Sequence, residues 1–129
     1  MFSTDSAVKV TTIAVLSSRI AYGAALLVSP EKVAAGRWLG PDARRPAAQV
    51  SLRGLGAREV ALHGAALACF LRGSPIRPFL AASIAGDLAD IGSTTLAREG
   101  LPEGSAPATA AVAGGSLLLT GLLAALVNE

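Results

Sequence analysis

Residues 106–127 read APATAAVAGGSLLLTGLLAALV and contain no charged side chain. A helix that crosses a bilayer needs about 20 mostly apolar residues, and this stretch is long enough. Ser105 is a good helix cap, and Pro107 is favoured in a first helical turn. The stretch therefore predicts a membrane-spanning helix, and this prediction decides how the rest of the chain is interpreted.

Three further apolar stretches precede it, over residues 10–28, 47–71 and 76–97. Proline disfavours helix in the residue before it, so Ser29-Pro30 ends the first stretch, and Pro46 is well placed to begin the second. The sequence predicts an all-α fold in which residues 1–129 form one domain, a bundle of four transmembrane helices.

The composition supports this interpretation. Only 16% of the 129 residues are charged, 52% are apolar, and the mean hydropathy is +0.55. Soluble domains carry about 25% charged residues. The apolar content and a net charge of +2 exclude a disordered chain, and the single cysteine, Cys69, excludes a disulfide scaffold. We expect an integral protein of a bacterial cell membrane, with the lipid bilayer as its surroundings.

The connection between the first two helices contains its own start signal, Ser29-Pro30-Glu31, and predicts a short interfacial helix over residues 31–39. Trp38 suits the membrane interface. Basic residues lie on both sides of the predicted membrane: Lys9, Arg72 and Arg77 on one, and Lys32, Arg37, Arg44, Arg45 and Arg98 on the other. The positive-inside rule then places both termini outside the cytoplasm.

Small residues recur every four positions along the predicted helices, as in Gly56, Val60 and Gly64. Such rows let helix axes approach closely in lipid, where no hydrophobic force holds helices together. The rows are consistent with a tight bundle and equally with a homodimer.

Seven ionisable residues lie inside the predicted spans: Arg19, Arg53, Arg58, Glu59, His63, Asp87 and Asp90. A charge at the bilayer centre costs about 2.5–3.5 kcal/mol on insertion scales. Three arginines match three carboxylates, so we expect these groups to pair with one another.

Spacing on the second span supports pairing. Glu59 and His63 are i,i+4 neighbours, and Arg53 shares an arc of about 120° with both, given about 100° per helical residue. Arg58 points away from this arc, so it must find a carboxylate on another helix or lie near a surface.

The first and third spans each present one polar face, Arg19 with Tyr22 and Asp87 with Asp90. Two acids one turn apart in a low dielectric resist joint ionisation, so one of the aspartates keeps its proton unless arginines neutralise both. The three polar faces converge, and the uncharged fourth helix is expected to form an apolar wall.

Several kinds of site are excluded. One histidine and one cysteine on the second span lack metal-ligand spacing. The chain has no phosphate loop, nucleophile elbow or basic-aromatic surface for nucleic acid. We expect no metal, no cofactor and no nucleic-acid partner.

Four short stretches, RIAYG at 19–23, RWLG at 37–40, RGLGARE at 53–59 and DLAD at 87–90, carry a resemblance. The pattern resembles uncharacterised small four-helix membrane proteins of actinobacteria, broadly DoxX-like in layout. The resemblance implies the same membrane architecture and no particular activity.

Three functions fit these residues. The first is a membrane-embedded enzyme that isomerises, cyclises or opens an epoxide on a lipid-like or terpenoid substrate, with Asp87 or Asp90 as general acid and Glu59-His63 as base. The binding residues would be Arg19, Tyr22, Arg53 and Arg58. The alternatives are a non-catalytic accessory subunit of a membrane complex and, ranked last, a small proton-coupled exporter.

Overall fold

The computed structural model describes residues 3–127, and within them it contains helices and no strand. The long helices are α1 (Thr4–Val28), α3 (Pro46–Leu71), α4 (Arg77–Leu96) and α5 (Ser105–Leu126). The short ones are α2 (Pro30–Ala34), η1 (Gly40–Arg44) and η2 (Arg98–Gly100). The all-α prediction is confirmed, and the four apolar stretches coincide with the four long helices, except that α1 begins well before residue 10.

Local signals account for the helix ends. The Ser3 hydroxyl accepts a hydrogen bond from the Ser6 amide and so caps α1. Gly73 and Gly104 have positive φ, in the turn after α3 and immediately before α5, a conformation that glycine adopts without steric cost. Arg77 at the start of α4 donates to the carbonyls of Ala124 and Val127, which fixes the end of α5.

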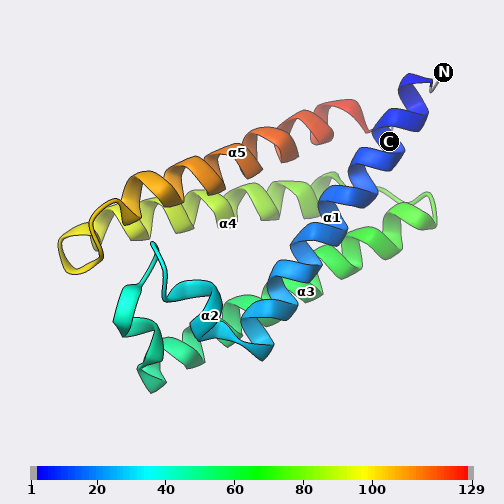
Figure 1. Ribbon diagram of the computed structural model, residues 1–129. Coiled ribbons are helices and arrows are strands. Elements are labelled where there is room, and N and C mark those ends of the chain that lie inside the picture. The colour runs from blue at the N-terminus through cyan, green and yellow to red at the C-terminus, as the bar shows by residue number, and fades with distance from the viewer. Residues whose placement is uncertain (1–2, 128–129) are drawn as a thin grey trace.

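The long helices form two pairs (Figure 1). α1 packs along α3, and α4 packs along α5, while contact between the pairs is sparser. The two chain ends lie near each other at one end of the molecule, and α2 and η1 lie at the other.

α1 and α3 cross at Gly23 and Gly56. A Cβ atom added at Gly23 would lie 2.7 Å from the Gly56 carbonyl oxygen, and one added at Gly56 would lie 2.6 Å from the Gly23 oxygen. The close approach predicted for Gly56 therefore occurs. Gly64, predicted to belong to the same packing row, has no neighbour within 4 Å of its Cβ position. Gly64 lies outside the packing row because the buried face of α3 follows Gly56, Glu59, His63 and Ala66.

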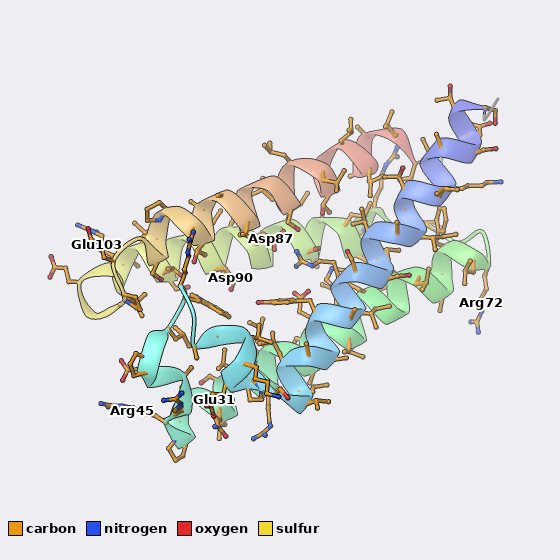
Figure 2. The ribbon with its side chains drawn as sticks, viewed as in Figure 1. Glu31, Arg45, Arg72, Asp87, Asp90 and Glu103 are labelled. Atoms are coloured by element: carbon orange, nitrogen blue, oxygen red, sulfur yellow. The ribbon has the colours of Figure 1, made fainter. Side chains whose placement is uncertain are left out.

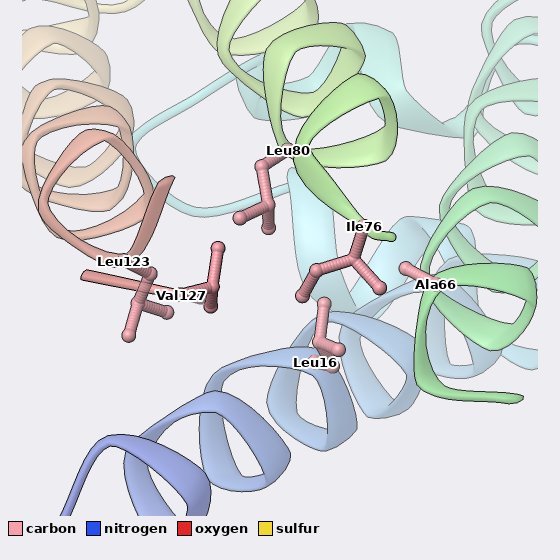
Figure 3. Close-up of a cluster of buried hydrophobic side chains, with 6 residues drawn as sticks. All are labelled: Leu16, Ala66, Ile76, Leu80, Leu123 and Val127. Carbon is pink, nitrogen blue, oxygen red and sulfur yellow. The ribbon is translucent and has the colours of Figure 1, made fainter. Parts of the chain in front are cut away.

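Two apolar clusters stabilise the ends of the bundle. One joins all four long helices and contains Leu16, Ala66, Ile76, Leu80, Leu123 and Val127 (Figure 3). The other lies at the end that contains α2 and η1, and its members are Leu26, Ala34, Ala43 and Leu52. Between the two clusters, α1, α3 and α4 place polar residues in the interior. The buried polar groups thus form a middle layer, about half-way along the long helices.

The segment between α1 and α3 differs from the predicted interfacial helix. Helix α2 ends at Ala34, before the expected end at residue 39, and η1 follows it. Trp38 is half-buried, its indole donates to the Thr94 hydroxyl at 3.4 Å, and the Ser105 hydroxyl donates to its carbonyl at 2.6 Å. Trp38 therefore ties this segment to the α4–α5 pair, because its polar groups find partners inside the protein.

Two helices, α1 and α5, are long and apolar enough to cross a membrane. Large apolar side chains are exposed along the long helices, including Val28, Val50, Leu71, Leu96, Val112 and Leu118. Charged residues make the mean hydropathy of α3 and α4 lower than that of α5.

Candidate functional site

Arg19 is the centre of the buried polar layer. Its Nε and Nη2 donate to the two carboxylate oxygens of Glu59 at 2.8 and 3.0 Å, and its Nη1 donates to Asp87 Oδ1 at 2.8 Å. The same Nη1 donates to the Ser116 hydroxyl. One guanidinium therefore joins α1 to α3, α4 and α5. The planar, forked donor set of arginine makes this four-helix junction feasible.

His63 lies beside this junction and is almost fully buried. Its Nδ1 is 2.9 Å from the Glu59 backbone oxygen and 3.4 Å from Glu59 Oε2, and its Nε2 is 2.9 Å from the Ser83 hydroxyl. A carbonyl oxygen only accepts, so Nδ1 carries a proton, and neutral His63 accepts from Ser83. His63 and Ser83 join α3 to α4 and hold the Glu59 turn in place.

Asp87 is 2% exposed, and only one of its two carboxylate oxygens has a hydrogen-bond partner among the described residues. Its Oδ1 accepts from Arg19, whereas its Oδ2 has no hydrogen-bond partner among the described residues. Buried polar atoms are almost always paired. The unpartnered oxygen sets Asp87 apart from Glu59, both of whose carboxylate oxygens bind Arg19.

A cavity of about 620 Å³ adjoins Asp87 between α1, α4, α5 and the Trp38 segment. Asp90, one turn from Asp87 along α4 (Figure 2), lines it as well, together with Tyr22 and Arg19. Most of the remaining wall is apolar and comes from α5, with Ala108, Ala111, Val112 and Ala113. The volume is in the range of small-molecule sites, so this is the candidate site.

The predicted residues fall into three groups in the structure. Arg19, Glu59, His63 and Asp87 are brought together in the interior. Tyr22 and Asp90 line the cavity beside them. Arg53 and Arg58 are exposed and do not join the cluster. Glu59 and His63 do not line the cavity, because they are enclosed behind Arg19.

The expected position of Arg53 is therefore wrong. Its Nε donates to the backbone carbonyl of Leu27, and its Nη1 lies 3.5 Å from the Gln49 side chain. The last carbonyls of a helix lack partners within the helix, and Leu27 is in the last turn of α1. Arg53 binds this free acceptor, since α3 places it at the level where α1 ends.

Sequence reasoning missed three contributors to the site. Ser83 and Ser116 bind His63 and Arg19, and Arg37 lines the cavity near Trp38. Ser83 precedes Asp87 by four residues and so shares its helix face, which is a signal that was present. Ser116 is one of four hydroxyl residues in an otherwise apolar helix, and nothing in its spacing singled it out. It also corrects the expectation that α5 is a purely apolar wall.

The described residues contain no group of three or more histidine, cysteine or acidic side chains that could hold a metal ion. No protein-family model matches the chain, and neither a curated protein nor a solved structure matches it. The site must therefore be interpreted from its own geometry.

Proposed function

We propose that the chain is an integral membrane protein in which all four long helices cross the bilayer. Each has 20 residues or more, enough to span a bilayer core. Only 22% of the apolar window of α1 and 17% of that of α5 is buried within the chain. Apolar helices exposed to this extent are favourable in lipid and costly in water. Glu59 on α3 and Asp87 on α4 are compatible with a lipid environment because both are paired with Arg19.

Within that setting, we propose that the cavity binds a lipid-like or terpenoid molecule and performs acid/base chemistry on it. The observation that carries this proposal is the apolar cavity with two carboxyl groups, Asp87 and Asp90, in its wall. Glu59 and His63, enclosed behind Arg19, act as positioning residues, because their hydrogen bonds fix the guanidinium. This assignment replaces the base role that their spacing suggested.

The two aspartates take different roles. Asp87 is held by Arg19 through Oδ1. Asp90 has no ion pair among the described residues and lies in the cavity wall one turn from the Asp87 carboxylate, so we assign it the role of the acid. Tyr22 borders the same space and is exposed enough to contact a bound molecule.

The proposed step on an alkene is an isomerisation. The Asp90 hydroxyl transfers its proton to one carbon of the double bond, whose π electrons form the new C–H bond and leave a carbocation on the other carbon. A neighbouring C–H then gives its proton to the Asp90 carboxylate, and its electron pair forms the shifted double bond. Asp90 is regenerated, and no oxidant or reductant is needed.

Deuterated water tests this proposal. The protein in nanodiscs is incubated with farnesol, geranylgeraniol, squalene and squalene epoxide, and with a bacterial lipid extract, and products are followed by mass spectrometry. We expect an isomerised or cyclised product with solvent deuterium on carbon, at least about a hundredfold less of it for Asp90→Asn, as for loss of a general acid, and normal amounts for the surface control Asp42→Asn. Equal turnover by Asp90→Asn, or no product above empty nanodiscs, would contradict an enzyme.

A second function is favoured by Arg58. This arginine is exposed half-way along α3, next to the exposed small residues Ala57, Ala61 and Ala65. An unpaired charge facing lipid is costly, whereas a partner helix bearing a carboxylate would pair with it and pack on the small residues. In this alternative the chain is an accessory subunit of a membrane complex. Native mass spectrometry after mild extraction should then show a heteromeric complex that Arg58→Leu dissociates, and a monomeric wild-type chain would contradict it.

A further inference from the structure

We infer that the molecule bound in the cavity is an amphiphile whose polar end donates an O–H or N–H hydrogen bond to Asp87 Oδ2, that is, an aliphatic or terpenoid alcohol or amine. This inference rests on the proposed function, because it names the class of ligand for the same cavity. It is independent of whether chemistry follows binding.

One carboxylate oxygen of Asp87 lacks a hydrogen-bond partner among the described residues. Asp87 lines the cavity, is 97% buried in its side chain, and has no partner for Oδ2 among the described residues. Leaving a charged acceptor unpaired in the interior is costly, and the cost is removed when a donor binds. Because Oδ1 is held by Arg19, Oδ2 is the carboxylate oxygen left for a donor that enters the cavity lined by Asp87.

The charge at the Arg19 end of the cavity also favours a donor. The guanidinium of Arg19 is shared between Glu59 and Asp87, and Asp90 borders the same space. The second lining arginine, Arg37, lies near Trp38. Carboxyl groups therefore outnumber the cation at the Arg19 end. A ligand that presents a donor, neutral or positive, is favoured here, and a ligand that presents a carboxylate or phosphate to this end of the cavity is repelled.

The remaining wall of the cavity suits the apolar body of an amphiphile. Val33, Ala108, Ala111 and Val112 make most of it apolar, and Trp38 lies at the end near α2. Val112 is 76% exposed, and Ser18 and Tyr22 on the facing side of α1 are exposed too. The cavity therefore opens between α1 and α5 toward the surroundings of the bundle. In a bilayer, an amphiphile can enter from the lipid with its apolar body along α5.

Trp38 provides the measurement, since it is the single tryptophan of the chain and lines the cavity. Bromine quenches tryptophan fluorescence on contact. The wild-type protein in nanodiscs is titrated with three probes that share the same eight-carbon chain: ω-bromooctanol, ω-bromooctylamine and ω-bromooctyl methyl ether. The ether lacks the donor. Bulk quenching in lipid is measured with the double variant Trp38→Phe, Val50→Trp, whose only tryptophan is at an exposed position outside the cavity.

We expect saturable quenching of Trp38 by the alcohol, the amine or both at concentrations at least about tenfold below that of the ether, as for a hydrogen bond to a charged group. Which of the two binds more tightly distinguishes a hydroxyl ligand from an ammonium ligand. Asp87→Asn, which keeps the size of the side chain, should remove most of this advantage, and Asp42→Asn should keep it. The comparison of alcohol with ether in the wild type needs no variant and therefore does not depend on how well Asp87→Asn folds.

Two results would overturn the inference, and they are distinguishable. Equal saturable binding of all three probes would show that the cavity accepts an apolar molecule without a donor, as when water alone satisfies Oδ2, and the proposed function would remain. Quenching by all probes that matches the bulk control would show that the cavity takes no such molecule, and the proposed function would fall as well.

Discussion

At the scale of single residues, Arg19 holds the interior together. It donates to side chains from three other helices, and two of its partners, Glu59 and Asp87, are almost fully buried carboxylates. Removing one partner of a buried ion pair leaves an uncompensated charge, which costs about 3–5 kcal/mol. Loss of Arg19 would therefore leave two buried carboxylates, Glu59 and Asp87, without their cation.

We predict that Arg19→Met lowers the free energy of unfolding by about 3–5 kcal/mol. Arg19→Lys should also be destabilising, because an ammonium group cannot bind both oxygens of Glu59 and reach Asp87 as well. Arg72→Met, the matched change at the exposed end of α3 (Figure 2), should stay within about 0.5 kcal/mol. Reversible unfolding in mixed micelles measures all three. A loss at Arg19 no larger than at Arg72 would contradict the network.

Sequence reasoning at this scale was correct where the contact is local. The i,i+4 pair Glu59 and His63 does form, since both residues are on one helix. Pairing between arginines and carboxylates was expected in general, and Arg19 binds Glu59 and Asp87 together. Arg53 was misplaced because an angle on a helical wheel does not say how far along the neighbouring helix a side chain lies.

At the scale of elements, the crossing of α1 and α3 depends on two glycines. Gly23 and Gly56 face each other so closely that a Cβ atom on either would press on backbone. Backbone cannot rotate away as a side chain can, so the helices must separate. That separation would also move Arg19 relative to Glu59, since these residues lie close to the crossing on the same two helices.

We predict that Gly56→Ala destabilises the protein by about 1–3 kcal/mol, as for an overpacked interior. Gly64→Ala on the same helix, where nothing lies within 4 Å of the added atom, should leave stability unchanged or raise it by up to about 1 kcal/mol through helix propensity. The pair is compared by unfolding under identical conditions. If Gly64→Ala were as damaging as Gly56→Ala, Gly64 would pack against a second chain.

At the scale of the whole molecule, two helix pairs enclose the cavity, and short connections fix which ends lie together. Gly40 contacts Pro102, so the α2–η1 segment and the α4–α5 connection share one end of the molecule. The turn after α3 lies at the other end, with the chain ends (Figure 1). Four membrane crossings would put these two sets of connections in different compartments.

We predict that cysteines placed at Asp42 and Glu103 are labelled from the same side of the membrane, and a cysteine at Ser74 from the opposite side, in a Cys69→Ser background. The basic residues near the α2–η1 end place Asp42 and Glu103 in the cytoplasm. An impermeant maleimide applied to intact and then permeabilised cells reports the side. Labelling of Asp42 and Glu103 from opposite sides would contradict four crossings.

The positions of the long helices could be predicted from the amino-acid sequence. Apolar runs bounded by proline, glycine and serine specify where helices begin and end, because these signals act within a few residues. It was also predictable that the ionisable residues pair with one another, since buried charges need partners. Which residues form each pair was not predictable.

The candidate site, in contrast, depends on how the helices pack against one another. The cavity, the unpartnered Oδ2 of Asp87, the contribution of Ser116 and the exclusion of Arg53 and Arg58 all depend on which helices are neighbours and at what height they cross. The crossing is set by backbone contact at Gly23 and Gly56. The periodicity of one helix contains no information about its partner's register, so packing between helices makes that choice.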